Sequence, residues 1–257
     1  MALLEVRGLT KTFGGLTAVC DLDFDVNEGE ILGIIGPNGA GKSTVFNMIC
    51  GALKPTQGTL TYRGQNITGL PPYKVARTGI ARVFQGNVLF PNSTVLENVL
   101  MGMHLHTQLG LLGFLLGGPR ARSRQKVLEA RAREILALVG LSHAESTLAS
   151  DLPHGNQRHL CLAIALAADP KLLLLDEPVT GMNAEEVSEM LDTVRMLRKE
   201  KGLTLIVIEH NMKAVMGLCD RIVAISYGRK IAEGTPAQIA NDPVVIEAYL
   251  GTEDDAA

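Results

Sequence analysis

Two short segments carry residues whose types and spacing suit phosphate and metal chemistry. The first is GPNGAGKST at 36–44, between the apolar run ILGII and the helical pattern VFNMICGAL. Its glycines allow successive backbone N–H groups to turn toward phosphate oxygens, and a helix beginning near Lys42 adds positive electrostatic potential. We expect Lys42 to reach the β- and γ-phosphates of a nucleotide and the Ser43 hydroxyl to bind Mg²⁺. The predicted nucleotide-binding residues are Gly36, Pro37, Asn38, Gly39, Ala40, Gly41, Lys42, Ser43 and Thr44.

The second segment is LLLLDEP at 172–178, an apolar run that ends in two carboxylates. In an α/β fold both carboxylates would lie at the carboxyl edge of the sheet, where phosphates bind. Asp176 is expected to hold Mg²⁺, and Glu177 is the candidate base that orients the attacking water. Alone, such an acid pair fits a strand-end cap equally well. Together with the phosphate loop it predicts a site where the phosphates of a nucleotide are bound and hydrolysed.

Apolar runs and helical patterns alternate along the chain and must position these residues. The runs at 31–35, 172–175 and 203–208 are apolar throughout, which is typical of central strands in a parallel sheet covered on both faces. In the segment 184–202, apolar residues recur at helical spacing and Gly202 follows as a stop. The alternation predicts an α/β fold with a mainly parallel sheet.

Other segments predict additions to this core within a single domain, 1–257. Residues 1–30 and 58–64 read as short antiparallel strands, and about 86–165 reads as an inserted helical subdomain with a helix over 125–141. Residues 166–257 complete the α/β core and form a C-terminal tail. Further strands are expected at 3–9, 80–84 and 222–226.

Composition excludes several classes of protein. A net charge of −3, 46% hydrophobic residues and 20% charged residues indicate a folded protein rather than a disordered one. The weak negative charge and the 4% of aromatic residues argue against a nucleic-acid partner. The four cysteines are far apart, which favours a reducing compartment over disulfides or zinc. The most membrane-like stretch, 109–118, is too short for a bilayer, which needs about 20 residues.

The order of several smaller motifs resembles the ATP-binding-cassette (ABC) ATPases, that is, P-loop NTPases with a RecA-like core. Phe13 lies in LTKTFGGLTAV, Gln85 follows RVF, TGMN occupies 180–183 and His210 follows IVIE. The resemblance implies that Phe13 stacks on adenine, that Gln85 contacts Mg²⁺ and the attacking water, and that His210 touches the γ-phosphate. Taken alone, Phe13 would be read as a core or hairpin residue, Gln85 as a polar surface residue and His210 as a cap at the end of a strand.

LPHGNQR at 152–158 stands where the family has its LSGGQ signature, which completes the ATP site of a partner cassette. The corresponding residues are Leu152, Pro153, His154, Gly155, Asn156 and Gln157. Three of the five signature positions differ. Pro153 offers neither a hydroxyl nor an N–H to a phosphate, and it suits the first turn of the following helix. We therefore expect slower hydrolysis of the partner-bound nucleotide.

Within the family, the chain looks most like the ATPase subunits of branched-chain amino-acid importers, on LTKTFGGLTAV, GPNGAGKSTVFNMICG and the ending IAEGTPAQIANDPVVIEAYLG. This implies a second ATPase subunit (a heterodimer is favoured over a homodimer), two membrane-spanning permease subunits and, indirectly, a periplasmic or surface substrate-binding protein. It also implies a peripheral position on the cytoplasmic face of the inner membrane. The alternatives are a lipopolysaccharide-export ATPase and a regulatory subunit with little hydrolysis. Cassettes that act on ribosomes or DNA usually carry a second cassette or a long coiled coil, and this sequence shows neither feature.

The helical subdomain of such ATPases usually forms the groove for permease coupling helices. The stretch 104–118, apolar and glycine-rich, is a candidate for part of that docking surface, with a packed helical hairpin as the alternative.

Overall fold

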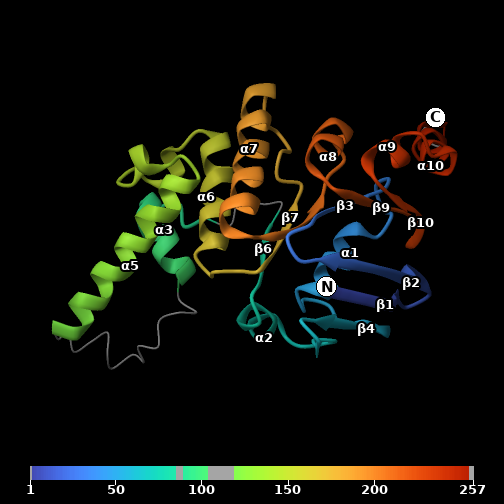
Figure 1. Cartoon of the computed structure of the whole chain (residues 1–257), viewed down its shortest axis with the longest axis horizontal. Coiled ribbons are helices and arrows are strands. Elements are labelled where there is room, and N and C mark those ends of the chain that lie inside the picture. Colours follow the sequence, from blue (N-terminus) through green and yellow to red (C-terminus); the bar gives the residue numbers. More distant parts are fainter. Residues whose placement is uncertain (1, 85–88, 104–118, 255–257) are drawn as a thin grey trace.

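The structure is a computed structural model that describes residues 2–84, 89–103 and 119–254. Two sheets and the helices around them make up the fold (Figure 1). The strands are β1 (Ala2–Phe13), β2 (Leu16–Asn27), β3 (Ile31–Ile35), β4 (Gln57–Tyr62), β5 (Gln65–Asn66), β6 (Ile80–Val83), β7 (Leu172–Asp176), β8 (Thr204–Ile208), β9 (Arg221–Ser226) and β10 (Arg229–Gly234). The helices are α1 (Lys42–Ile49), α2 (Pro72–Arg77), α3 (Val95–Gly102), α5 (Pro119–Leu138), α6 (His154–Leu166), α7 (Ala184–Lys201), α8 (Met212–Leu218), α9 (Pro236–Ala240) and α10 (Pro243–Asp254), with short 3₁₀ helices at Ser142–Ala144 and Ala149–Asp151.

The central sheet has six strands in the order β10-β9-β3-β8-β7-β6. Every neighbouring pair from β9 to β6 is parallel, and only β10 pairs antiparallel with β9. The predicted α/β fold with a mainly parallel sheet is therefore confirmed. The antiparallel edge strand β10 was not predicted, because its sequence RKIAEG lacks an apolar run.

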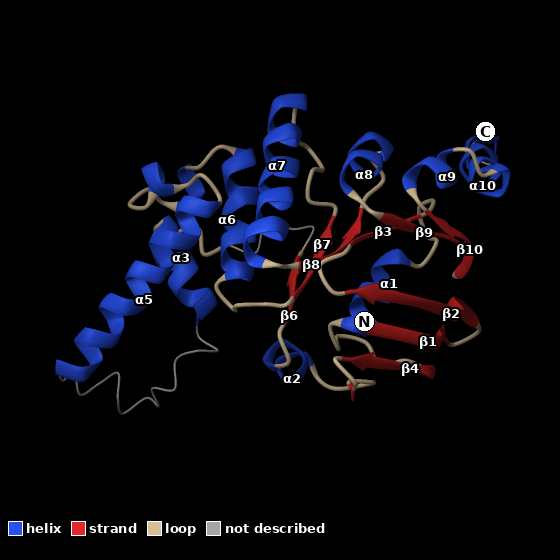
Figure 2. Ribbon diagram, in the orientation of Figure 1, coloured by secondary structure: helices blue, strands red, loops and turns tan. Residues whose placement is uncertain are grey.

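The apolar strands serve two hydrophobic cores, one on each face of this sheet. In β7, Leu173 and Leu175 belong to one core, whereas Leu172 and Leu174 belong to the other. The first core lies under helices α3 and α5 to α10, and the second lies between the sheet, α1 and the antiparallel strands. Figure 2 shows these two layers on either side of β3, β8 and β7. Burial on both faces is the reason that these strands carry no alternating polar residues.

The smaller sheet is antiparallel, in the order β2-β1-β4-β5. Its strands β1, β2 and β4 fall within the segments 1–30 and 58–64 that were expected to form such a unit, and β5 adds a two-residue hairpin partner to β4. Helices α3, α5 and α6 lie between β6 and β7 in the chain. The exact domain boundaries stay a prediction.

Local signals explain where the long helices begin and end. Helix α7 begins at a capping box, in which the Asn183 side chain accepts from the Glu186 backbone and the Glu186 side chain accepts from Asn183. It ends at Gly202, whose φ of 62° is left-handed. Helix α5 ends at Leu138, earlier than the predicted residue 141, because the chain turns at Gly140 with φ 76°.

The topology places the ends of β3, β7 and β8 at the same edge of the central sheet, because these strands are parallel neighbours. The phosphate loop follows β3, the acid pair closes β7 and His210 follows β8. Across the described parts of the chain, no helix combines the length and apolar character needed to cross a membrane.

Candidate functional site

The phosphate loop connects β3 to α1 and folds around the Lys42 side chain. The ammonium group donates to the carbonyl oxygens of Gly36 (2.6 Å) and Pro37 (2.9 Å). An ammonium has three N–H donors, so a third can reach a phosphate. Burial lowers the pKa of Lys42, and the negative charges of Glu177 and Asp176 act in the opposite direction. The loop lysine and the acid pair therefore share one site.

Two loop glycines are required by close approach of neighbouring strands. A Cβ at Gly36 would lie 2.0 Å from the carbonyl oxygen of Ile225 in β9, and one at Gly41 would lie 2.5 Å from that of Ala18 in β2. Gly39 has open space instead. Helix α1 begins at Lys42 without a side-chain cap or an acidic residue in its first turn. Its first N–H groups are thus available to an anion.

Asp176 ends β7 as a buried carboxylate, 4% exposed. Its Oδ2 atom lies 2.5 Å from Nη2 of Arg82, and both side chains are almost fully shielded from solvent. Sequence reasoning missed Arg82, because an arginine in a short strand gives no signal of the partner it will meet. The buried charge of Asp176 has a partner, as buried charges require.

Glu177 stands in a strained turn directly after β7. Its φ is +50°, a left-handed conformation that costs a non-glycine residue about 1–2 kcal/mol. Its N–H donates to the Ile208 carbonyl (2.9 Å), and its Oε2 accepts from the Thr180 hydroxyl (3.2 Å). Its Oε1 lies 3.6 Å from Nδ1 of His210. The side chains of Glu177 and His210, both predicted to be catalytic, thus face one another with their closest polar atoms too far apart for a hydrogen bond.

Glu209 is a second residue that sequence reasoning missed. It is 2% exposed and accepts from three backbone N–H groups: Val179 (3.0 Å), His210 (3.1 Å) and Asn211 (3.3 Å). It therefore ties the turn after β7 to the turn after β8. The signal was available, since a carboxylate following the apolar run LTLIVI must find hydrogen-bond partners where it is buried.

The signature residues gather at the start of α6, against the start of α7. The His154 ring lies 3.3 Å from the Cβ position that Gly181 lacks, and a Cβ at Gly155 would lie 2.7 Å from Oε1 of Glu186. Gly155 therefore packs closely against the Glu186 side chain, which would have to shift to admit a larger residue. Pro153 is the N-cap residue directly before α6, whereas the first turn of the helix was the position that it was expected to suit.

The remaining predicted residues lie at separate places. Phe13 ends β1 opposite Leu16 in the hairpin to β2 and is 45% exposed, with the Lys11 ammonium 5.0 Å from its ring centre. It is therefore a hairpin residue outside the core, with a surface that a base can reach. Gln85 and the stretch 104–118 lie outside the described residues. Asn183, on the TGMN loop, caps α7.

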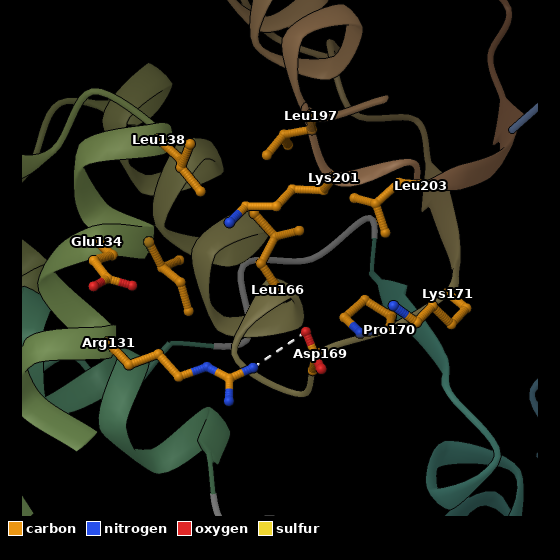
Figure 3. A pocket seen from close by; sticks show the side chains of 11 residues that line it. Arg131, Glu134, Leu138, Leu166, Asp169, Pro170, Lys171, Leu197, Lys201 and Leu203 are labelled. Atoms are coloured by element: carbon orange, nitrogen blue, oxygen red, sulfur yellow. Dashed lines mark ion pairs between the residues drawn. The ribbon is translucent and has the colours of Figure 1, made fainter. Parts of the chain in front are cut away.

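A pocket of about 150 Å³ lies at the opposite end of β7 and β8, between α5 and α7 (Figure 3). The Arg131–Asp169 ion pair (3.1 Å) spans one side of it, and Lys201 points into it. Its lining combines apolar and charged side chains and contains none of the predicted site residues.

Replacing Gly36 by Ala tests the loop geometry. The added methyl group would overlap the Ile225 carbonyl, which costs about 1–3 kcal/mol, and φ +156° at this position adds backbone strain. We expect urea denaturation to show that the free energy of unfolding falls by both costs. Gly39→Ala is the matched control, because it meets open space and carries only the backbone cost of φ +79°, about 1–2 kcal/mol. Equal losses from the two variants would contradict the close approach of β9.

Comparison with known proteins agrees with this geometry. The family model described as "ABC transporter" matches residues 19–180, and one described as "Branched-chain amino acid ATP-binding cassette transporter" matches residues 229–255. The high-affinity branched-chain amino acid transport ATP-binding protein LivG of Salmonella typhimurium is 44% identical over 97% of this chain and 98% of that protein. The lipopolysaccharide export system ATP-binding protein LptB of Haemophilus influenzae is 34% identical over 98% of this chain and 99% of that protein.

Solved structures show the same fold. The ADP conformation of the ATP-binding cassette MJ1267 matches with a TM-score of 0.86 and 31% identity, over 98% of this chain and 99% of that one. The dimeric cassette MJ0796 matches with a TM-score of 0.76 and 25% identity, over 91% and 98%. The chain therefore belongs to the ABC transporter family, as an ATP-hydrolysing cassette protein of the LivG type.

Proposed function

We propose that this chain is the ATP-binding and ATP-hydrolysing subunit of an importer for branched-chain or related amino acids. The observation that carries the proposal is the grouping of Lys42, Asp176, Glu177 and His210 at one edge of the central sheet. The substrate class rests on the 44% identity to LivG and on the tail match at residues 229–255. Both favour the importer over the lipopolysaccharide exporter, whose ATPase is 34% identical.

In this proposal each residue at the edge has a separate task. Lys42 and the loop N–H groups bind the phosphates, and Phe13 offers its exposed ring to the adenine base. Glu177 orients the attacking water and accepts its proton, while His210 lies beside it and contacts the γ-phosphate. The strained backbone of Glu177 is held by Ile208 and fixes where its carboxylate points.

The donor set at this edge fits Mg²⁺. Asp176 supplies a buried carboxylate and Ser43 a hydroxyl, both oxygen ligands of the kind that Mg²⁺ prefers alongside substrate phosphates. Gln85 completes the proposed set. Among the described residues, no group of three or more His, Cys, Asp or Glu could hold a metal ion. When bound, the ion would neutralise charge that develops on the phosphates.

The proposed assembly pairs this chain head to tail with a second cassette, favoured to be a different ATPase subunit. The signature residues 152–157 then cover the γ-phosphate bound by the partner. Two permease subunits anchor the pair at the cytoplasmic face of the inner membrane and receive substrate from a binding protein. ATP closes the pair and hydrolysis opens it, which moves the permeases.

Loss of the base traps the ATP-bound state. We expect Glu177→Gln to retain ATP and to accumulate as a closed cassette pair, whereas Lys42→Ala loses ATP binding, because it removes the cation that holds the β- and γ-phosphates. Size-exclusion chromatography with radiolabelled ATP measures both outcomes. Wild-type turnover by Glu177→Gln would overturn the assignment of the base. Strong hydrolysis by the wild-type pair also excludes the low-hydrolysis regulatory alternative.

The altered signature predicts unequal sites in a heterodimer. Pro153 removes a hydroxyl and an N–H, and loss of one charge-assisted hydrogen bond weakens the contact by about 10- to 150-fold. The partner-bound nucleotide should turn over more slowly. ATPase rates with Glu177→Gln in this chain, compared with the equivalent change in its partner, measure the difference. The change in this chain should cost more of the total rate, and equal losses would remove the asymmetry.

The membrane partner tests the transport role directly. We expect the tagged full chain to copurify from membranes with two permease subunits and to support ATP-dependent uptake of leucine, isoleucine or valine in vesicles. The Lys42→Ala variant should copurify but not support uptake. Copurification with a lipid-export permease instead would establish the alternative function.

A further inference from the structure

Arg82 is a buried arginine on the edge strand β6, next to the proposed catalytic edge. Its side chain is 8% exposed, and a buried guanidinium must find partners for its donors. It lies outside the phosphate loop, and although it begins the string RVF that precedes Gln85, the family resemblance assigns it no role. The proposed function leaves its presence beside Asp176 unexplained.

The guanidinium bridges two elements that carry predicted Mg²⁺ ligands. Nη2 donates to Oδ2 of Asp176 (2.5 Å), at the end of β7. Nη1 donates to Oδ1 of Asn47 (2.6 Å) on α1, the helix that begins at Lys42 and includes Ser43. One rigid, planar group therefore spans from the helix of the phosphate loop to the carboxylate.

Two aromatic rings flank the guanidinium. Its central carbon lies 5.6 Å from the ring centre of Phe46, which is fully buried, and 4.7 Å from that of Phe84, which is 49% exposed. Such contacts favour a cation over an aromatic face. Phe84 directly precedes Gln85 in the chain. Arg82 thus also contacts Phe84, the residue directly before Gln85, which is the third predicted Mg²⁺ ligand.

The electrostatics show what Arg82 prevents. The negative charge of Asp176 acts on the Lys42 ammonium. Without Arg82, the buried Asp176 carboxylate would turn toward that lysine for a partner. This change removes a metal ligand and occupies the phosphate-binding lysine. The positive charge of Arg82 would repel a nearby Mg²⁺, so a positioning role requires that the order imposed on the ligands gains more than this repulsion costs.

We propose that Arg82 is a positioning residue that sets the spacing of the Mg²⁺ ligands, holding Asp176 directly and Ser43 through Asn47 on α1. The inference rests on the proposed function, because it concerns the Mg²⁺ that accompanies ATP. It predicts that Arg82 matters for the contribution of Mg²⁺ to ATP affinity and not for ATP affinity in the absence of the ion.

The test is ATP binding at equilibrium, measured by calorimetry in EDTA and again in excess Mg²⁺, on a Glu177→Gln background that prevents turnover. The ratio of the two dissociation constants gives the gain in affinity due to Mg²⁺. Arg82→Gln should lower this gain by about 10-fold or more, as loss of a charge-assisted contact implies. Its affinity in EDTA should stay close to that of the parent.

Two further variants separate positioning from folding. Asn47→Ala keeps the Arg82–Asp176 ion pair and the contact with Phe46, and removes only the hydrogen bond from Arg82 to the Asn47 side chain. It should therefore lower the Mg²⁺ gain by a smaller factor, even if Arg82→Gln fails to fold. Arg198→Gln is the matched control, since it removes another ion pair (Asp220, 2.9 Å) and a hydrogen bond to the Gly29 carbonyl. Gly29 and Asp220 precede β3 and β9, at the opposite end of the parallel strands from Asp176. It should lower thermal stability and leave the gain unchanged.

Each other outcome is decisive. An unchanged or increased Mg²⁺ gain in Arg82→Gln and Asn47→Ala would overturn the positioning role. A loss of affinity of equal size in EDTA and in Mg²⁺ would assign Arg82 to the folding of the loop and would also overturn it. If the parent protein binds no ATP under either condition, the proposed function itself fails, and this inference fails with it.

Discussion

The parallel pairing of β3, β8 and β7 is the constraint on which the rest of this structure depends. Parallel neighbours end at the same edge of a sheet, so segments distant in sequence supply one site. Burial of these strands on both faces fixes their register, because each leucine of β7 belongs to one of two cores. The loop, the acid pair and His210 are therefore held by the most deeply packed part of the protein.

Charge placed at the edge of a buried sheet must be compensated, and the way it is compensated organises the site. Asp176 is paired with Arg82, and Glu209 accepts from three backbone N–H groups across two turns. Lys42 bonds to carbonyls of its own loop. These interactions leave Glu177, in its strained turn, as the carboxylate that faces His210. The same network that stabilises the fold thus places the proposed catalytic base beside His210.

The sequence predicted the structure correctly where a single segment determines which strand, loop or helix forms. Uniform apolar runs predicted β3, β7 and β8, and the loop motif predicted the junction of β3 with α1, because these depend on local periodicity and glycine spacing. Arg82 was missed because its partner, Asp176, is far away in the chain. Glu209 was overlooked although a carboxylate directly after the apolar run LTLIVI signals a need for hydrogen-bond partners, one of which, at Val179, is distant in the chain. Gly155 was read only as a phosphate contact, although the structure shows that it allows α6 to approach Glu186. The edge strand β10 lacks the apolar run that marks a buried strand.

In the proposed function, ATP binds at the carboxyl edge of the central sheet. Hydrogen–deuterium exchange of the Glu177→Gln protein, with and without Mg²⁺ and ATP, tests this binding site most directly. With Mg²⁺ and ATP we expect slower amide exchange in residues 36–44 and in the turns after β7 and β8, and little change near the pocket between Arg131 and Lys201. Protection at that pocket without protection of residues 36–44 would contradict it.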